Sequence, residues 1–425
     1  MSSDVSFNRL KQFPRLMWIL LFGSFITRGS YYMVWPFLAV ILYERFALSA
    51  TEVGLILSTA AVVSVFVSFI GSSLSDRFGR HQLMYVSGAL YIISFSLLAE
   101  VNSIQGYTVV ITLCSIATSL WRPLTSALIG DIIDDDKTRE LAMQSLYFAV
   151  NVGCAIGPLL GVWFGLTGEQ SSFYITAMAF AFLLVLLAWG FNHQKKISAA
   201  KNEKELNSAA KKSTHNFQQT MRVLLKDKLL QCLILANILC MFIYAQMDSS
   251  LIQYLTRAKV PNLLALISSI IFTNAVVIIS SQFVLLKLMA RLSIVHRIQI
   301  GLLLLLLMVS QVWLANNSLT FFWGWIGAIV VMSLAEAILF PTMNVHIDRL
   351  APKHLRGAYF GAASFYDFGF AIAPLGGGII LDHFGGFWLF ISGAALTLFV
   401  MFMYAFLEKL PRPNFENLKT KASLD

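Results

Sequence analysis

The sequence predicts an all-α polytopic membrane protein with twelve transmembrane helices in two six-helix repeats. Three observations support this prediction. The 425 residues are 57% hydrophobic and only 12% charged, about half the charge of an ordinary soluble domain. About a dozen apolar runs reach the roughly 18 residues that a helix needs to cross a bilayer. Landmarks in the first half of the chain recur in the second half at a nearly constant offset.

The apolar runs alternate with short polar connections along the whole chain. The expected spans are residues 16–42, 52–74, 82–100, 106–130, 141–166, 171–191, 229–255, 262–286, 297–315, 319–347, 357–381 and 386–407. The stretch 192–228 is rich in Lys, Asn, Ser and Ala, which is typical of a polar linker. The sequence therefore predicts four parts in order. They are an N-terminal six-helix half (1–191), a cytoplasmic linker (192–228), a C-terminal six-helix half (229–407) and a cytoplasmic tail (408–425).

The net charge of +9 is explained by the predicted topology. Arg28 and Arg122 lie within spans, and Arg45, Arg257 and Lys259 lie on one predicted face of the membrane. All other Lys and Arg residues fall on the opposite face, as the positive-inside rule requires of the cytoplasmic side. We therefore expect a multi-pass protein of the inner (plasma) membrane with both termini in the cytoplasm, and no nucleic-acid partner.

The internal repeat is visible in four pairs of residues separated by 216 to 218 positions. The pairs are Pro123 and Pro341, Asp131 and Asp348, Arg139 and Arg356, and Pro158 and Pro374. Coincident landmarks of this kind indicate a duplication that produced two parallel repeats, with the linker between them.

Residues 71–81, GSSLSDRFGRH, form a short cationic hinge between the second and third expected spans. The pattern Gly71, Asp76, Arg77, Gly79 and Arg80 resembles the loop signature of the major facilitator superfamily, at the same place between helices. The resemblance implies the major facilitator fold and a conformational latch in this loop.

In that latch, Asp131 at the inner end of the fourth span would clasp Arg77 or Arg80. The corresponding stretch of the second half, residues 287–297, lacks the Gly-Asp-Arg-Gly pattern. The implied latch is therefore asymmetric, with the first half carrying most of it.

Residues 153–161, GCAIGPLLG, place Gly153, Gly157 and Gly161 four residues apart, with Pro158 among them. Such a stripe allows close helix packing, and the proline allows a kink. The stretch also resembles the fifth-helix motif of major facilitator antiporters. That resemblance implies a gate that packs against the other half, and export by exchange; a generic packing face is the alternative.

Five ionisable residues lie inside the expected spans, namely Arg28, Arg122, Asp248, Glu336 and Asp367. A charge within hydrocarbon is costly, so each is expected to face a cavity or a partner. Glu336 is the first candidate for the coupling proton because apolar residues surround it, and Asp367 and Asp248 follow. In the alternative interpretation, these acids only form fixed ion pairs with the two arginines.

Polar and aromatic residues at helical spacing are candidates for the wall of a substrate cavity. They are Arg28, Tyr32, Trp35, Arg122, Asn151, Asn237, Tyr244 and Asn274. Aromatic and methionine side chains suit adaptable apolar or cationic ligands. Ordinary helix packing is the alternative explanation of the same stripe.

Within that superfamily, the chain most resembles the drug:proton antiporter branch. Its run Ala335-Glu336 before Pro341 resembles the tenth helix of the MdtH-type multidrug exporters. This resemblance implies a monomeric secondary transporter in membrane lipid, which expels small amphipathic or cationic compounds in exchange for protons by alternating access.

The alternative is a dedicated exporter of an anionic metabolite or siderophore that uses Arg28 and Arg122. Phosphate-binding, metalloprotease, paired-cysteine and serine-nucleophile motifs are absent from the sequence, so neither an enzyme, a cofactor nor a metal is expected. The duplicated halves also favour alternating access over a channel.

Overall fold

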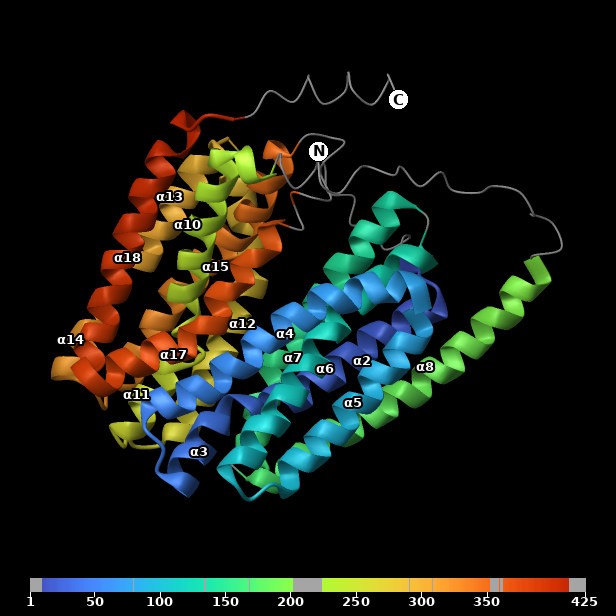
Figure 1. Cartoon of the computed structure of the whole chain (residues 1–425), viewed down its shortest axis with the longest axis horizontal. Helices are drawn as coiled ribbons and strands as arrows, with labels where there is room; N and C mark the ends of the chain where they lie inside the picture. The colour runs from blue at the N-terminus through green and yellow to red at the C-terminus, as the bar shows by residue number, and fades with distance from the viewer. Residues whose placement is uncertain are drawn as a thin grey trace.

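The computed structural model describes residues 10–78, 80–133, 135–167, 169–201, 224–289, 291–307, 309–351, 359 and 362–412. Helices alone make up the secondary structure of these residues, and they form two bundles that lie side by side (Figure 1). The first bundle contains α2 to α8, and the second contains α10 to α18.

The N-terminal bundle consists of six long helical stretches, of which the first is broken. Its helices are α2 (Arg15–Val34), η1 (Trp35–Phe37), α3 (Leu38–Phe46), α4 (Ala50–Phe78), α5 (Arg80–Glu100), α6 (Ile104–Ile132), α7 (Asp136–Trp163), η2 (Gln170–Ser172) and α8 (Phe173–Lys201). The break at η1 coincides with Pro36, which has no N–H for the helical ladder.

The C-terminal bundle repeats this plan with more interruptions. Its helices are α10 (Lys228–Ala245), α11 (Ser250–Arg257), α12 (Leu263–Leu288), α13 (Ile294–Leu306), α14 (Val309–Asn317), α15 (Phe322–Leu350), η4 (Ser364–Tyr366), α17 (Asp367–Phe384), α18 (Gly386–Phe406) and η5 (Leu407–Lys409). The break between α10 and α11 is a turn in which polar side chains bind the backbone. There the Ser249 hydroxyl donates to the Ala245 carbonyl, and the Gln246 amide donates to the Phe242 carbonyl.

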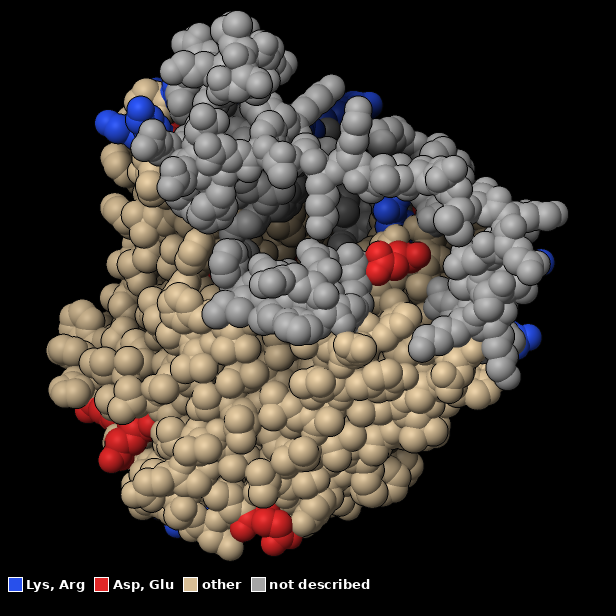
Figure 2. All heavy atoms as spheres, turned by 45° about the vertical axis from the view of Figure 1, so that its right-hand side comes forward, with Lys and Arg blue, Asp and Glu red and all other residues tan. Residues whose placement is uncertain are grey.

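Ten stretches of the described chain are long and apolar enough to cross a membrane. The other two expected spans correspond to the broken pair α13 and α14 and to α17. Figure 2 shows a broad band without Lys, Arg, Asp or Glu across the middle of one face of the molecule. An uncharged belt of this kind is the surface that a helical membrane protein presents to lipid.

Each bundle has its own hydrophobic core. One core is built from residues between Phe13 and Phe191, and the other from residues between Leu224 and Leu407. A third, small cluster joins the bundles and contains Phe37, Val40, Ile252, Ile267 and Ile271. The structure thus has two separate cores, and the division into four parts stays a prediction.

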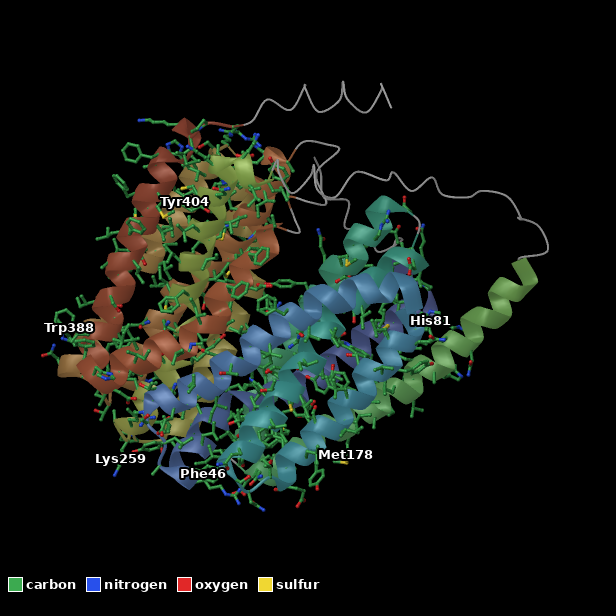
Figure 3. The ribbon with its side chains drawn as sticks, viewed as in Figure 1. Phe46, His81, Met178, Lys259, Trp388 and Tyr404 are labelled. Atoms are coloured by element: carbon green, nitrogen blue, oxygen red, sulfur yellow. The ribbon has the colours of Figure 1, made fainter. Side chains whose placement is uncertain are left out.

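The two ends of the molecule are named here by the connections they carry. The linker end holds the start of α10 and the end of α18, and the far end holds the connections from α3 to α4 and from α11 to α12. Phe46 and Lys259 lie at the far end, whereas Tyr404 lies toward the linker end (Figure 3). The two bundles converge at the far end and splay toward the linker end (Figure 1).

Two expected boundaries differ from the structure. The hinge predicted over residues 71–81 is almost entirely helical, because α4 continues to Phe78 and α5 begins at Arg80. Gly79 lies outside the described residues. Similarly, α8 continues to Lys201, ten residues into the predicted linker. Apolar length marks where a helix can cross a bilayer, but a helix can continue beyond it, as α8 does through the good helix formers Gln, Lys and Ala of residues 192–201. Helix propensity does not explain the continuation of α4, because residues 71–76 are mostly Gly, Ser and Asp.

Candidate functional site

A cavity with two connected chambers lies between the bundles. The first chamber has a volume of about 470 Å³ and is walled mainly by α2, α5, α6 and α7. The second has a volume of about 500 Å³ and lies between α7 of one bundle and α10, α12, α15 and α17 of the other. Six residues line both chambers and mark the place where they join. They are Met143, Tyr147, Asn151, Glu336, Phe340 and Phe370.

Glu336 lies in the middle of α15 and is held on one oxygen only. Its Oε2 accepts a hydrogen bond from the Tyr244 hydroxyl of α10 and another from Asn274 Nδ2 of α12, at 2.8 Å. Asn274 Nδ2 also lies 3.1 Å from Ser333 Oγ, one turn before Glu336. Among the described residues, Oε1 has no hydrogen-bond partner. This second oxygen can therefore take a proton or a ligand from the cavity.

Arg28 is the cationic residue of the first chamber. It lies on α2 with its guanidinium carbon 5.7 Å from the centroid of the Tyr31 ring. Tyr31 is in turn stacked on Trp35 at 5.0 Å between ring centroids. No acid pairs with Arg28 in the part of the chain that the structure describes. The interpretation in which the intramembrane acids neutralise this arginine by fixed ion pairs therefore does not hold for Arg28 there.

The other two acids occupy different positions. Asp367 begins α17 and lines the second chamber, so it shares that chamber with Glu336. Asp248 was expected within the seventh span. It lies there in the turn between α10 and α11 and is exposed. The helix ends at Ala245 because the polar residues that follow bind the backbone, so α10 stops before Asp248.

The expected substrate-cavity residues fall into three groups. Arg28, Tyr32 and Asn151 line the first chamber. Tyr244 and Asn274 donate hydrogen bonds to Glu336, which lines both chambers. The remaining ones lie elsewhere: Trp35 packs on Tyr31, and Asn237 is buried, where it accepts a hydrogen bond from Tyr404. Arg122 is in α6, and its side chain lies outside the described part.

Three of the contributors to the cavity that the sequence interpretation missed are Met143, Phe370 and Ser333. Met143 and Phe370 line both chambers, and Ser333 bonds the amide that holds Glu336. A helical-spacing signal existed for two of them, since Ser333 precedes Glu336 by three residues and Phe370 follows Asp367 by three. No comparable signal singled out Met143 among the chain's methionines.

The small-residue stripe of α7 packs within its own bundle. A Cβ added at Gly157 would collide with the Gly29 carbonyl of α2, and one at Gly153 would meet the Phe25 carbonyl. Gly161 faces Met33, which is also in α2. The expectation that this stripe packs against the other half is therefore wrong, because glycines on both helices let α2 and α7 approach closely. Pro158 lies inside α7.

Most side chains of the predicted latch lie outside the residues that the structure describes. Gly71 is helical in α4, but the side chains of Asp76, Arg77 and Arg80 are not described. Asp131 is exposed in the last turn of α6. The latch stays a prediction.

The far end of the cavity is closed by contacts between the bundles. Asp382 of α17 accepts hydrogen bonds from the backbone N–H groups of Ala50, at 3.0 Å, and Thr51, at 2.6 Å. These are N–H groups at the start of α4, where a carboxylate is favoured. Arg257 donates to the Leu48 carbonyl at 2.9 Å and lies 4.7 Å from the centroid of the Tyr43 ring. The apolar cluster of Phe37, Val40, Ile252, Ile267 and Ile271 adds a hydrophobic contact between the bundles.

Comparison with known proteins identifies the family of this fold. A sequence profile described as Major Facilitator Superfamily matches residues 20–367. The MFS-type transporter YqjV of Bacillus subtilis is 27% identical over 376 residues, covering 88% of each chain. A Na(+), Li(+), K(+)/H(+) antiporter of Planococcus maritimus is 25% identical over 439 residues, covering 95% of this chain and 98% of its own.

Solved structures give the same result for the fold. A transporter of the POT family, solved with 5-aminolevulinic acid, superposes with a TM-score of 0.73 at 18% identity and covers 93% of this chain and 96% of its own. The nucleoside transporter NupG gives a TM-score of 0.73 at 13% identity, over 92% and 99% of the two chains. These similarities confirm the fold class predicted from the sequence.

Proposed function

Because this chain belongs to the Major Facilitator Superfamily, we propose that it works as a proton-coupled antiporter that expels small amphipathic or cationic compounds. It is a multi-pass membrane transporter. The coupling to protons, the direction and the substrate are proposals, as is the assignment to the drug:proton antiporter branch.

One observation carries the proposal: Glu336 offers to a cavity between two bundles one carboxyl oxygen that none of the described residues engages. An acid at this depth is costly unless it is neutralised or paired. Proton and cationic substrate would therefore compete for Oε1, so that loading one releases the other. Asp367, in the same chamber, is the second acid in this exchange, and Asp248 the third.

Alternating access supplies the second half of the mechanism. With the far end closed by Asp382 and Arg257, the cavity would exchange its contents toward the linker end. Rocking of the bundles would break those contacts and close the linker end through the latch of Gly71, Asp76, Arg77, Gly79, Arg80 and Asp131. We place the linker end in the cytoplasm, because the Lys and Arg residues gather in its connections.

A second candidate function is exchange of a monovalent metal cation for a proton. The name of the Planococcus maritimus relative supports it, and so does the set of oxygen atoms around Glu336, which includes the Tyr244 hydroxyl and Ser333. The third candidate is export of an anionic metabolite, which Arg28 supports because no acid pairs with it in the described part of the chain.

Transport by the purified protein in liposomes with an imposed pH gradient separates these functions. The probes are ethidium, Na+ and 3-phenylpropionate. Gradient-driven movement of ethidium supports the proposed function, whereas movement of Na+ alone or of 3-phenylpropionate alone replaces it with the corresponding candidate. Movement of every probe at the same rate with and without the gradient would contradict proton coupling.

A further inference from the structure

The central cavity has a positive pole in one bundle and a negative pole in the other. Arg28 of α2 and Glu336 of α15 both line the first chamber. The structure shows no ion pair between them and no acid on Arg28 among the described residues. Two opposite charges that share a deep cavity without pairing are costly as they stand, and each gains from a ligand of the opposite sign.

Among the residues whose side chains the structure describes, Arg28 is the one cationic group that lines the first chamber, and three nearby hydroxyls are already engaged as donors. Thr27 donates to the Gly23 carbonyl at 2.8 Å, Thr118 to the Cys114 carbonyl at 2.7 Å and Thr125 to the Trp121 carbonyl at 2.9 Å. These hydroxyls retain only lone pairs for a ligand. The guanidinium, with five N–H donors in a planar fork, is the group that matches a carboxylate.

The negative pole is one oxygen atom. Tyr244 and Asn274 both bind Oε2 of Glu336, which fixes the carboxyl group and leaves Oε1 toward the chambers. This atom can accept from one ammonium group or carry one proton, but not both. Asp367 adds acidic character to the same chamber.

An apolar and aromatic wall lies beside the poles. Met143, Phe340 and Phe370 line both chambers, and the Tyr244 ring packs edge-on against Phe340 at 5.0 Å and Phe370 at 5.8 Å. Such a wall takes an apolar body rather than a hydrated ion. Chambers of about 470 and 500 Å³ also fall within the size range of small-molecule sites.

We propose that the transported molecule is an amphipathic zwitterion, with its carboxylate on Arg28, its ammonium group on Glu336 Oε1 and its apolar body against Phe340 and Phe370. This inference rests on the proposed function, since it makes the ammonium group the competitor of the coupling proton. The positive pole, Arg28, does not exchange protons. It therefore contributes to the affinity for the substrate without taking part in the coupling.

Three probes that share one aromatic body test the two poles separately. They are L-phenylalanine, 2-phenylethylamine and 3-phenylpropionate, which carry both charges, only the cation and only the anion. Binding is measured by calorimetry on the full chain in lipid nanodiscs near neutral pH. We expect L-phenylalanine to bind at least tenfold more tightly than either singly charged probe.

Variants then assign each pole. Arg28→Gln is expected to weaken L-phenylalanine at least tenfold and to change 2-phenylethylamine less than twofold. Glu336→Gln is expected to weaken 2-phenylethylamine and spare 3-phenylpropionate. Arg28→Lys keeps the charge but loses the fork, so it is expected to give intermediate binding, and it replaces Arg28→Gln if that variant fails to fold.

The proposal is overturned if 2-phenylethylamine binds the wild type as tightly as L-phenylalanine, if the Arg28 variants bind L-phenylalanine normally, or if none of the three probes binds. Failure of this inference and of the proposed function are distinguishable. Gradient-driven ethidium transport together with no preference for the zwitterion would overturn the zwitterion alone. A clear zwitterion preference without any effect of a pH gradient would overturn the antiport alone.

Discussion

Glu336 owes its candidate role to an arrangement that three helices create. Tyr244 comes from α10, Asn274 from α12 and the carboxylate from α15, and all three meet at Oε2. Hydrogen bonds to a charged group contribute about 1.5–3 kcal/mol each. The two donors therefore decide how readily the carboxylate stays charged in the cavity.

The Tyr244→Phe variant removes one of these donors and leaves the ring in place. Because the carboxylate loses part of its stabilisation, we expect the half-maximal point of the transport pH profile to move to higher pH by about one unit, since 1.36 kcal/mol corresponds to one unit. Proton-driven flux measured across a pH series checks this. Tyr404→Phe is the control, because Tyr404 bonds to Asn237 and not to Glu336; an unmoved profile in Tyr244→Phe would show that the hydrogen bond does not tune the exchange.

Sequence reasoning at this scale identified the charges but not their partners. The cost of charge in hydrocarbon singles out Arg28 and Glu336 in the sequence, and both line the cavity. It does not reveal which side chains from other helices meet them, because crossing angles and rotations decide that. The same gap explains Asn237, which lies on a plausible helical face but is buried against Tyr404.

At the scale of elements, α2 and α7 approach each other closely in the N-terminal bundle. Gly29 faces both Gly153 and Gly157, and the neighbouring backbone leaves no room for a Cβ at Gly157. Backbone groups cannot move aside as a flexible side chain can. The stripe therefore fixes the spacing of the helix that carries Arg28 and the helix that carries Asn151.

The Gly157→Ala variant should push α7 away from α2. Overpacking of this kind costs about 1–3 kcal/mol, so we expect a lower melting temperature in detergent and weaker ligand binding. Gly327→Ala in α15 is the matched control, because a Cβ there meets nothing within 4 Å. Equal melting temperatures for the two variants would contradict the close packing.

Helix boundaries were predictable only to the extent that apolar length determines them. The expected spans locate the helices, but the break at Pro36 and the turn after Ala245 interrupt two of them. The proline is a visible signal in the sequence. The turn is not, because it contains neither proline nor glycine and depends on Gln246 and Ser249 binding the backbone.

The whole molecule is held closed at the far end by a few contacts between the bundles. Asp382 binds the first N–H groups of α4, and Arg257 binds the Leu48 carbonyl. These bonds join the two bundles directly, so they exist only while the far end is closed. Their strength therefore sets the balance between the two states of the transporter.

We expect Asp382→Asn to shift that balance toward a state open at the far end. Losing about 1.4 kcal/mol changes the ratio of the two states tenfold. Spin labels at the exposed residues Glu44 and Pro261, one on each bundle, report the change as a new population at longer distance. Glu100→Gln is the control, since Glu100 accepts a hydrogen bond from Tyr174 within its own bundle. Identical distance distributions in wild type and Asp382→Asn would rule out a role for this contact in closure.

The repeat found in the sequence predicted two bundles but not how they meet. Pro158 and Pro374 recur at the same offset, and both lie inside helices, α7 and α17. Yet α17 also packs closely against α4 of the other bundle, where a Cβ at Gly54 would collide with the Pro374 carbonyl. Duplication predicts the similarity of the halves, whereas their interface depends on contacts that no single half contains.

The central claim is that Glu336 couples proton movement to substrate movement, and one measurement tests it most directly. Wild type and Glu336→Gln are compared in liposomes in two modes, exchange of a probe without a pH gradient and accumulation driven by one. The probe is whichever of ethidium and L-phenylalanine the wild type moves. A neutral amide cannot exchange a proton and binds an ammonium group more weakly, so the account predicts that Glu336→Gln retains exchange only at higher probe concentration and loses gradient-driven accumulation at every concentration. Full gradient-driven accumulation by Glu336→Gln, or none by the wild type with either probe, would contradict it.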